Sequence, residues 1–375
     1  MSKVQAFIKK HNIPRLGFGC MRLPTLGSDD KIDIEEFKKL VDTYIEAGFN
    51  YFDTAYMYHG GMSELAVKEA VVKRYPRESF ILVDKLPIWS IEKKEDVEKI
   101  FNEQLEKCGT EYFDIYLLHA LNDANNAKHE EMGSYEFCQK MKEQGKIKSF
   151  GFSFHGTTDD MQHIMQKHHE KFDIVQLQVN YFDWLGFYRE QYEIVTSYGK
   201  PVVCMEPVRG GILARMPKHI ESILKDANPD VSTASWAIRW VGCLPEVVTV
   251  LSGMSNMEQL KDNITQMSNF KPLTEDEYVT IGKAAQALKD IPTVPCTGCN
   301  YCFKCPKNIP IAKIFDLYNA FLGNRSMFQF KTAYKEIEQK NNASACISCG
   351  VCEAACPQRI QIPNRLAEIS ILMDV

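Results

Sequence analysis

The sequence predicts an α/β protein, in which a (β/α)8 TIM barrel over residues 1–272 is followed by a small, mainly α-helical domain over residues 291–375. Two observations predict this organisation. Short apolar runs rich in β-branched and aromatic residues alternate with helical stretches through the first part of the chain. Eight of the thirteen cysteines then lie between Cys296 and Cys356. Residues 273–290 have the pattern of a helical connector between the two parts.

Eight expected strands account for the barrel. Each is a short apolar run, which is typical of a parallel strand buried on both faces. They cover residues 15–21, 49–55, 80–85, 114–120, 148–154, 173–179, 201–207 and 247–253. Eight strands that alternate with helices indicate a closed barrel. A doubly wound sheet is the competing architecture, but no early strand is followed by a G-x-G-x-x-G motif.

The stretches between the strands have the apolar period of helices. After Asp33, a favourable N-cap residue, apolar side chains recur every three or four positions until Gly48. The stretch between Glu92 and Gly109 repeats the pattern, and Ser63 opens another helix. Helices therefore separate neighbouring strands, as parallel pairing requires.

Composition and charge exclude several classes of partner. The formal net charge is −5 and the pI is about 6.0, which leaves no basic footprint for nucleic acid or an anionic membrane surface. No apolar run approaches the roughly 18 residues that a membrane span needs, and the first residues show no cleavage pattern. We therefore expect no nucleic acid, no membrane and a cytoplasmic location, where thiolates stay reduced.

The cysteines after residue 295 form two runs with the spacing of iron–sulfur ligands. The first run is Cys296-x2-Cys299-x2-Cys302-x2-Cys305-Pro306, and the second is Cys346-x2-Cys349-x2-Cys352-x3-Cys356-Pro357. The second has the spacing of the bacterial ferredoxin motif, in which the fourth cysteine of each run binds the other cluster. The expected ligands are Cys296, Cys299, Cys302 and Cys356 for one [4Fe–4S] cluster, and Cys346, Cys349, Cys352 and Cys305 for the other.

Structural zinc is the alternative for these runs. Zinc normally takes two cysteine pairs and has no use for a third cysteine at this spacing. In the first run the last gap is one residue shorter than in the standard motif, which makes Cys305 the ligand with the weakest support. Helical stretches between the runs favour an α-helical ferredoxin-type domain. The other cysteines show no spacing and are expected to be small core groups: Cys20, Cys108, Cys138, Cys204 and Cys243.

Four polar residues stand at or just after the ends of three successive strands. Asp53, Lys85 and His119 each close an apolar run, and Tyr58 follows in the loop after Asp53. These strand ends form the catalytic face of a barrel. A tyrosine with a pKa of ~10 is a poor acid at neutral pH, and a neighbouring lysine ammonium favours the phenolate and lowers that pKa. An aspartate keeps the lysine charged, while a neutral histidine donates a hydrogen bond to a carbonyl oxygen.

These residues also carry a family resemblance. The segment NYFDTAYMYHGGMSE, the strand-ending Lys85 and the segment DIYLLH resemble the aldo/keto reductases, whose tetrad is Asp, Tyr, Lys and His in that order. The resemblance extends from about residue 16 to residue 264. With the cysteine runs included, the chain resembles the branch of that family that has a C-terminal 4Fe-4S domain.

The resemblance implies a role for each member of the tetrad. Tyr58 is the general acid, Lys85 the neighbour that lowers its pKa, Asp53 the partner of Lys85, and His119 the residue that orients the carbonyl. The resemblance also implies a nicotinamide cofactor that lies extended across the barrel mouth.

The resemblance also implies which residues bind this cofactor, NADH or NADPH. They are Ser153, Gln176, Met205, Gly253, Ser255, Gln259 and Asn263. Phe154 stands where the family usually has an Asn that holds the carboxamide, and His155 is the candidate substitute. Members that prefer NADP usually have Lys or Arg at the positions of Gly253 and Gln259. Neither residue is basic here, so we expect weaker discrimination for NADPH over NADH than is usual in the family. Arg209, Arg215 and Lys261 are the alternative sources of the missing charge.

The sequence leaves more than one function open. The leading hypothesis is an NAD(P)H-dependent reductase of a small aldehyde or ketone that carries two [4Fe–4S] clusters. The alternative is an iron–sulfur electron-transfer oxidoreductase that couples the barrel to an external redox partner protein. A non-catalytic redox sensor is a third reading, against which the complete tetrad argues. Aromatic candidates for the substrate pocket are Trp89, Tyr56, Trp184 and Phe187.

Overall fold

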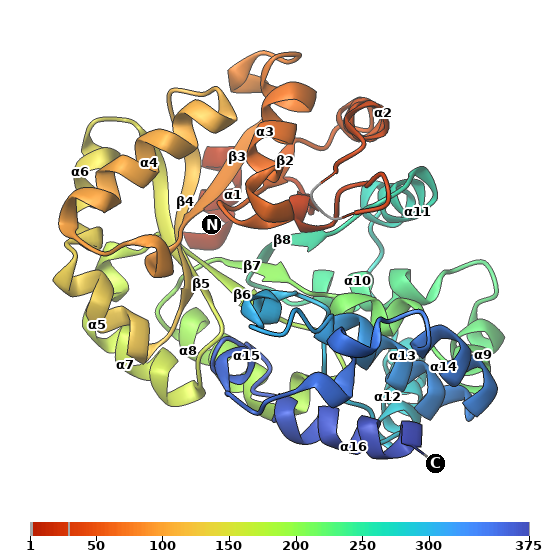
Figure 1. The fold of residues 1–375 in the computed structure, drawn as a ribbon. Coiled ribbons are helices and arrows are strands. Elements are labelled where there is room, and N and C mark those ends of the chain that lie inside the picture. Colours follow the sequence, from red (N-terminus) through yellow and green to blue (C-terminus); the bar gives the residue numbers. More distant parts are fainter. Residues whose placement is uncertain (1–2, 29–30, 375) are drawn as a thin grey trace. The chain divides into compact units, whose positions relative to one another are not determined.

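The computed structural model describes residues 3–28 and 31–374. Its first part is a closed barrel of parallel strands, in which each strand pairs with the next and β8 pairs with β1 (Figure 1). The strands are β1 (Leu16–Gly19), β2 (Tyr51–Asp53), β3 (Ile81–Leu86), β4 (Phe113–Leu121), β5 (Ile147–Phe154), β6 (Ile174–Gln178), β7 (Val202–Met205) and β8 (Val247–Ser252). The predicted barrel is confirmed, and each of these strands overlaps one expected strand, although β3, β4 and β5 extend one residue beyond the expected range at one or both ends.

Helices cover the outside of the barrel (Figure 1). Those in or partly in the barrel unit are α1 (Lys3–His11), α2 (Ile34–Glu46), α3 (Ser63–Val67), α4 (Lys94–Cys108), α5 (Asp123–Glu131), α6 (Ser134–Glu143), α7 (Thr158–His168), α8 (Arg189–Ser197), α10 (Thr233–Gly242) and α11 (Met257–Ser268). The side chain of Asp33 caps α2 by accepting a 3.0 Å hydrogen bond from Glu36 N. Gly109 ends α4 in the left-handed conformation, with φ of 68°, which glycine adopts at little cost. Asp33 and Gly109 therefore begin and end these two helices as the sequence predicts.

Alternate residues of the strands fill the barrel interior. Ile81, Val83, Ile115 and Leu117 belong to one buried cluster there, and Val4 of α1 packs against the same cluster. Successive side chains of a strand point to opposite faces. Lys85 therefore points inward like Ile81 and Val83, whereas Asp84 points outward to the helices.

The described chain divides into two compact units. The first comprises residues 1–207 and 237–273, and the second comprises residues 208–236 and 274–375, so the division falls within α10. The domain boundaries expected from the sequence stay a prediction. Within the described residues, no helix is both long enough and apolar enough to cross a membrane.

The second unit is built from helices and cysteine-rich turns. Its helices are α9 (Lys218–Ala227), α12 (Glu275–Lys289), α13 (Ile311–Asn324), α14 (Met327–Tyr334), α15 (Val351–Ala354) and α16 (Ile362–Asp374). A core that includes Ile314, Phe315, Phe330 and Ile369 fills the space between its C-terminal helices, and five of the predicted ligand cysteines pack against it: Cys296, Cys302, Cys305, Cys346 and Cys356.

A segment that follows β7 also belongs to this second unit. Gly210 has φ of 64°, and a Cβ at this position would lie 2.0 Å from the carbonyl oxygen of Thr297. Only glycine allows that approach. The first cysteine run is therefore packed against residues 208–236, which the sequence places in the barrel.

Candidate active site

A buried ion pair lies at the C-terminal end of the barrel strands. Lys85 Nζ donates to Asp53 Oδ1 at 2.7 Å and to the Thr54 carbonyl oxygen at 2.7 Å. The side chains of Lys85 and Asp53 are 0% and 4% exposed. Burial raises the pKa of the Asp53 carboxyl, and the Lys85 ammonium opposes that shift. The pair joins the ends of β2 and β3, as the sequence suggests.

Tyr58 lies beside this pair, in the turn after β2. Lys85 Nζ is 5.0 Å from the centroid of its ring. The sequence predicts that Lys85 lowers the pKa of Tyr58, and the structure shows the opposite direction. Burial, followed by the negative charge of Asp53, raises this pKa well above 10, because a phenolate would be both desolvated and close to a carboxylate. Tyr58 therefore keeps its proton at neutral pH.

His119 on β4 completes the group. Its ring lies 6.1 Å from that of Tyr58 at an interplanar angle of 82°, and 4.9 Å from that of Trp89. Burial, followed by the charges of Lys85 and His155, lowers the pKa of His119 well below 6.5. A neutral imidazole in this position has an N–H that can donate to an oxygen beside the Tyr58 hydroxyl. The four residues predicted from three strand ends are thus gathered at one end of the barrel.

Sequence reasoning missed two groups in this neighbourhood. Thr54 directly follows Asp53, and its carbonyl oxygen accepts from Lys85. Glu206, which directly follows β7, has φ of 56° and contributes to the raised pKa of Tyr58. A signal for Glu206 exists in the sequence, because it is an acidic residue at the end of an apolar run, as Asp53 is.

The residues expected at the nicotinamide lie on neighbouring strands. Ser153 and Gln176 are partners across β5 and β6, and Gln178 and Met205 are partners across β6 and β7. Gln176 Nε2 donates to Met205 Sδ at 3.6 Å, whereas Gln176 Oε1 is buried without a hydrogen-bond partner among the described residues. Ser153 Oγ accepts from Ala120 N at 2.9 Å. An orphaned amide oxygen and a hydroxyl fit the N–H and carbonyl groups of a carboxamide.

The residues expected at the adenosine phosphate surround the start of α11. Ser255 Oγ donates to the Arg22 carbonyl oxygen at 2.8 Å, and Ser255 N donates to Gln259 Oε1 at 2.8 Å. Asn263 is 4% exposed and donates to Ser252 Oγ at 2.7 Å, so its amide braces the end of β8. Arg22 was not selected from the sequence, yet a Cβ on Gly253 would lie 2.9 Å from Arg22 Cβ. A basic residue therefore adjoins Gly253, one of the two positions that lack one.

Cysteines of both runs meet in the second unit. A cavity there is lined by the four cysteines predicted for one cluster, with residues that include Thr297, Ile311 and Pro357: Cys296, Cys299, Cys302 and Cys356. Burial raises the pKa of Cys302, and charges on Cys296, Cys356 and Cys352 add to this shift. Burial also raises the pKa of Cys352, and charges on Cys305 and Cys346 add to it. The cavity fits one iron–sulfur cluster whose fourth ligand comes from the other run, while the ligand set of a second cluster stays a prediction.

The remaining cysteines lie elsewhere. Cys20, Cys108, Cys138 and Cys204 are buried, and Cys243 is partly buried. Burial raises the pKa values of the four buried thiols, which keeps them protonated.

Similarity to known proteins agrees with both parts of the chain. The model of the aldo/keto reductase family matches residues 15–286, and that of a 4Fe-4S dicluster domain matches residues 295–361. The uncharacterized oxidoreductase YqkF of Bacillus subtilis is 25% identical over 300 residues, which cover 71% of this chain and 90% of that protein. The NADH-specific methylglyoxal reductase of Escherichia coli is 23% identical over 296 residues, which cover 66% and 88%.

Solved structures show the same fold. An aldo/keto reductase from Klebsiella pneumoniae, crystallised with NADP and acetate, superposes with a TM-score of 0.61 at 22% identity, covering 72% of this chain and 91% of that one. The family match spans most of the chain, and relatives over the same region are named as reductases or oxidoreductases. The chain therefore belongs to the aldo/keto reductase family, as an oxidoreductase with a 4Fe-4S domain C-terminal to its barrel.

Proposed function

We propose that this protein uses NADH or NADPH to reduce the carbonyl group of a small aldehyde or ketone, and that its C-terminal domain holds two [4Fe–4S] clusters. The observation that carries the proposal is the buried Lys85–Asp53 pair beside a protonated Tyr58 and a neutral His119. These groups can bind an oxygen and give it a proton. A bound nicotinamide supplies the hydride that the carbonyl carbon needs.

The protein's own residues handle the oxygen. His119 donates a hydrogen bond to the carbonyl oxygen and orients it toward the Tyr58 hydroxyl. As negative charge develops on that oxygen, Tyr58 transfers its proton to it and becomes a phenolate. The Lys85 ammonium, 5.0 Å from the Tyr58 ring centroid, stabilises the phenolate at this stage. The high resting pKa of Tyr58 and the stabilising charge of Lys85 therefore act at different stages of the reaction.

The choice of cofactor follows from the segment around α11. Ser153 and Gln176 would hold the carboxamide, and Met205 would pack on the ring. Gly253 and Gln259 provide no charge for a 2′-phosphate, and a 23% identical relative is named as NADH-specific. We therefore propose that the enzyme accepts NADH and discriminates weakly in favour of NADPH.

The clusters would hold the C-terminal unit together. Cysteines pack against the small core of this unit, and iron–sulfur ligation adds folding energy to such a core. The electron-transfer alternative has one supporting observation, because Cys349 is exposed. A second cluster bound there would lie near the surface, where an external redox partner could reach it.

A turnover screen tests the proposed reaction. Protein purified without oxygen is offered a panel of aldehydes and ketones with NADH and then with NADPH, and cofactor oxidation is matched to alcohol formation. We expect turnover with both cofactors and its loss in the Tyr58→Phe variant. No turnover with any carbonyl compound, or equal turnover in the variant, would contradict the proposal.

A further inference from the structure

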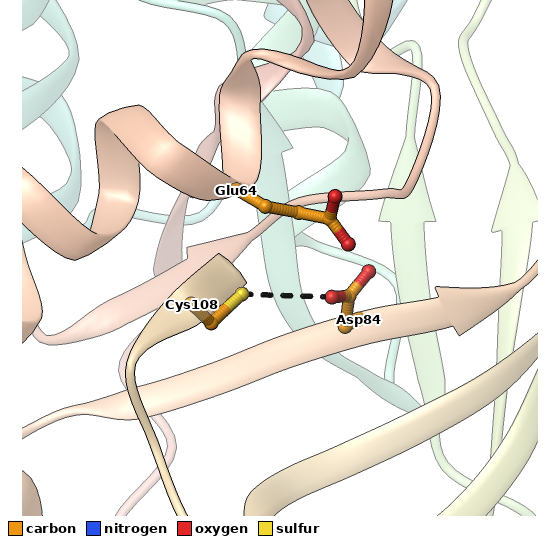
Figure 2. Close-up of side chains that lie close together, drawn as sticks. All are labelled: Glu64, Asp84 and Cys108. Atoms are coloured by element: carbon orange, nitrogen blue, oxygen red, sulfur yellow. Dashed lines mark hydrogen bonds between the residues drawn. The ribbon is translucent and has the colours of Figure 1, made fainter. Parts of the chain in front are cut away.

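Three polar side chains lie close together on the outer face of β3, opposite to the inner face from which the Lys85 side chain points. Glu64 comes from α3, Asp84 from β3 and Cys108 from the end of α4, and one ligand-type atom of each lies within 4.8 Å of the others. All three residues are buried, with 0% exposure of each. Figure 2 shows the two carboxyl groups facing each other, with the Cys108 sulfur beside the Asp84 carboxyl group and joined to it by a dashed line. The proposed catalytic steps do not use this group.

The contacts of the group imply a shared proton. Asp84 Oδ1 accepts from Lys85 N at 2.8 Å, and Asp84 Oδ2 accepts from Cys108 Sγ at 3.7 Å. Lys107 Nζ pairs with Glu64 Oε2, while Glu64 Oε1 is buried without a conventional hydrogen-bond donor among the described residues. Two facing buried carboxylates repel each other, but a single proton between them forms a strong hydrogen bond.

The surrounding charges agree with one proton on the pair. Burial, followed by the charge of Glu64, raises the pKa of Asp84 well above 3.8. Burial also raises the pKa of Glu64, which Lys107 opposes. With one proton the pair has a single negative charge, and Lys107 balances it. Other groups with electrostatic influence here are Lys85, Cys108, Tyr116, Cys20, Tyr56 and Tyr58.

The backbone of Lys85 needs partners at this point of the sheet. The pairing of β2 with β3 ends at Asp53 and Val83, after which Thr54 N donates to the Val83 carbonyl oxygen. Lys85 lies two residues further along. Its N–H is bound by Asp84 Oδ1, and its carbonyl oxygen accepts from Gln104 Nε2 at 3.0 Å. Side chains thus take the place of strand neighbours at the residue whose ammonium faces Tyr58.

We propose that Asp84 is a positioning residue for Lys85, and that the proton it shares with Glu64 allows this carboxylate to remain buried. Asp84 and Gln104 hold the peptide groups of Lys85, so the ammonium stays fixed between Asp53 and the Tyr58 ring. The kinetic part of this inference rests on the proposed reductase function, whereas the structural part does not. A metal ion is the rival occupant, since two oxygens and a sulfur could ligate one.

Two substitutions at one position separate these ideas. Asp84→Asn keeps an oxygen for Lys85 N–H, and its amide can donate to Glu64 in place of the shared proton. Asp84→Ala removes both contacts. We expect the amide of Lys85 to exchange with solvent at least about tenfold faster in Asp84→Ala, and at a near wild-type rate in Asp84→Asn, by NMR-detected hydrogen exchange. This readout needs no enzymatic activity.

Kinetics supply the second readout. Asp84→Ala should lower kcat by about 10- to 100-fold with the KM for cofactor unchanged, because a small displacement of Lys85 weakens its support of the Tyr58 phenolate. In a Lys85→Met background the same substitution should have no further effect on kcat. If Asp84 acted independently of Lys85, the losses of kcat in Asp84→Ala and Lys85→Met would instead add in the double variant.

Each outcome decides one idea. Equal exchange of the Lys85 amide in wild type and Asp84→Ala overturns the positioning role. An inactive wild type with the expected exchange pattern contradicts the reductase proposal alone. If Asp84→Ala does not fold, Gln104→Met, which removes the donor to the Lys85 carbonyl oxygen, must lower kcat in the same way and have no further effect in the Lys85→Met background, or the proposal fails. Stoichiometric zinc that is lost in Asp84→Ala and Cys108→Ser would replace the shared proton with a metal site.

Discussion

Lys85 is charged inside the barrel, with a side chain that is 0% exposed. A buried charge that loses its partner typically costs a protein about 3–5 kcal/mol of stability. Substitution of Lys85 or Asp53 on its own therefore disturbs folding and catalysis together, so Lys85→Met serves only as the background of a double-mutant comparison. Tyr58 is the better probe at the scale of single residues, because phenylalanine preserves its ring packing and removes only the hydroxyl.

Tyr58→Phe should lower kcat for carbonyl reduction by ~10²–10⁴-fold, the usual contribution of a general acid. Cofactor affinity, measured by fluorescence titration, should stay close to wild type because the ring remains. Tyr135→Phe is a matched control, since Tyr135 is a buried tyrosine of α6 that donates to Asn126. Retention of most activity in Tyr58→Phe would remove this residue from the acid role.

The raised pKa of Tyr58 predicts a flat pH profile. A general acid works in its protonated form, so a raised pKa moves the loss of activity to higher pH. His119 works in its neutral form, and its lowered pKa moves the opposite loss to lower pH. We expect kcat for reduction to stay level between about pH 6.5 and pH 9. A decline centred near neutral pH, measured with saturating substrates, would show that Lys85 outweighs burial.

At the scale of elements, β3 explains what sequence reasoning can and cannot find. Lys85 is conspicuous in the sequence because it stands at the end of an expected strand whose first four residues are apolar. The role of the neighbouring Asp84 depends on its contacts with Glu64 and Cys108. These two residues are distant from it in the sequence and reach it only when α3 and α4 pack on the strand. The barrel follows from the alternation of strands and helices, and the closeness of the four polar residues follows from their places at successive strand ends. The cysteine spacing predicts that Cys356 joins the first run, and Cys356 lines one cavity with Cys296, Cys299 and Cys302. Arg22, Glu206 and the place of residues 208–236 depend on tertiary packing.

The second cysteine run provides a prediction at this scale. Cys349→Ser should abolish one cluster and loosen residues 291–375, because ligation supplies folding energy to a unit with a small core. Iron analysis and hydrogen-exchange mass spectrometry measure the two effects. Cys243→Ser is the control, since Cys243 lies outside the runs and serine still offers an acceptor to Leu273 N. An unchanged iron content in Cys349→Ser would exclude this ligand.

At the scale of the whole molecule, two chemistries with different electron counts share one chain. A nicotinamide gives up two electrons as a hydride, whereas a [4Fe–4S] cluster accepts one electron at a time. The proposed role of the clusters in holding the second unit together requires no such division of the electron pair, whereas the electron-transfer alternative does require it.

Iron content and rapid kinetics test this view together. Protein purified without oxygen should contain about eight iron and eight sulfide and no stoichiometric zinc, as two [4Fe–4S] clusters require. After NADPH is mixed with the oxidised protein in a stopped-flow instrument, the cluster absorbance should not bleach at the rate of turnover. Bleaching at that rate without added flavin would favour the electron-transfer alternative. About four iron would mean that one run binds no cluster.

The cavity lined by Cys296, Cys299, Cys302 and Cys356 has a consequence for how the protein is made. If Cys356 completes this ligand set, the first three thiolates emerge from the ribosome long before the fourth, and a cluster delivered early would be incompletely held. Cys305 is in the same position with respect to the second run. Loading of both clusters must then wait until the second run has been synthesised, so a chain interrupted between the runs would be unable to hold either one.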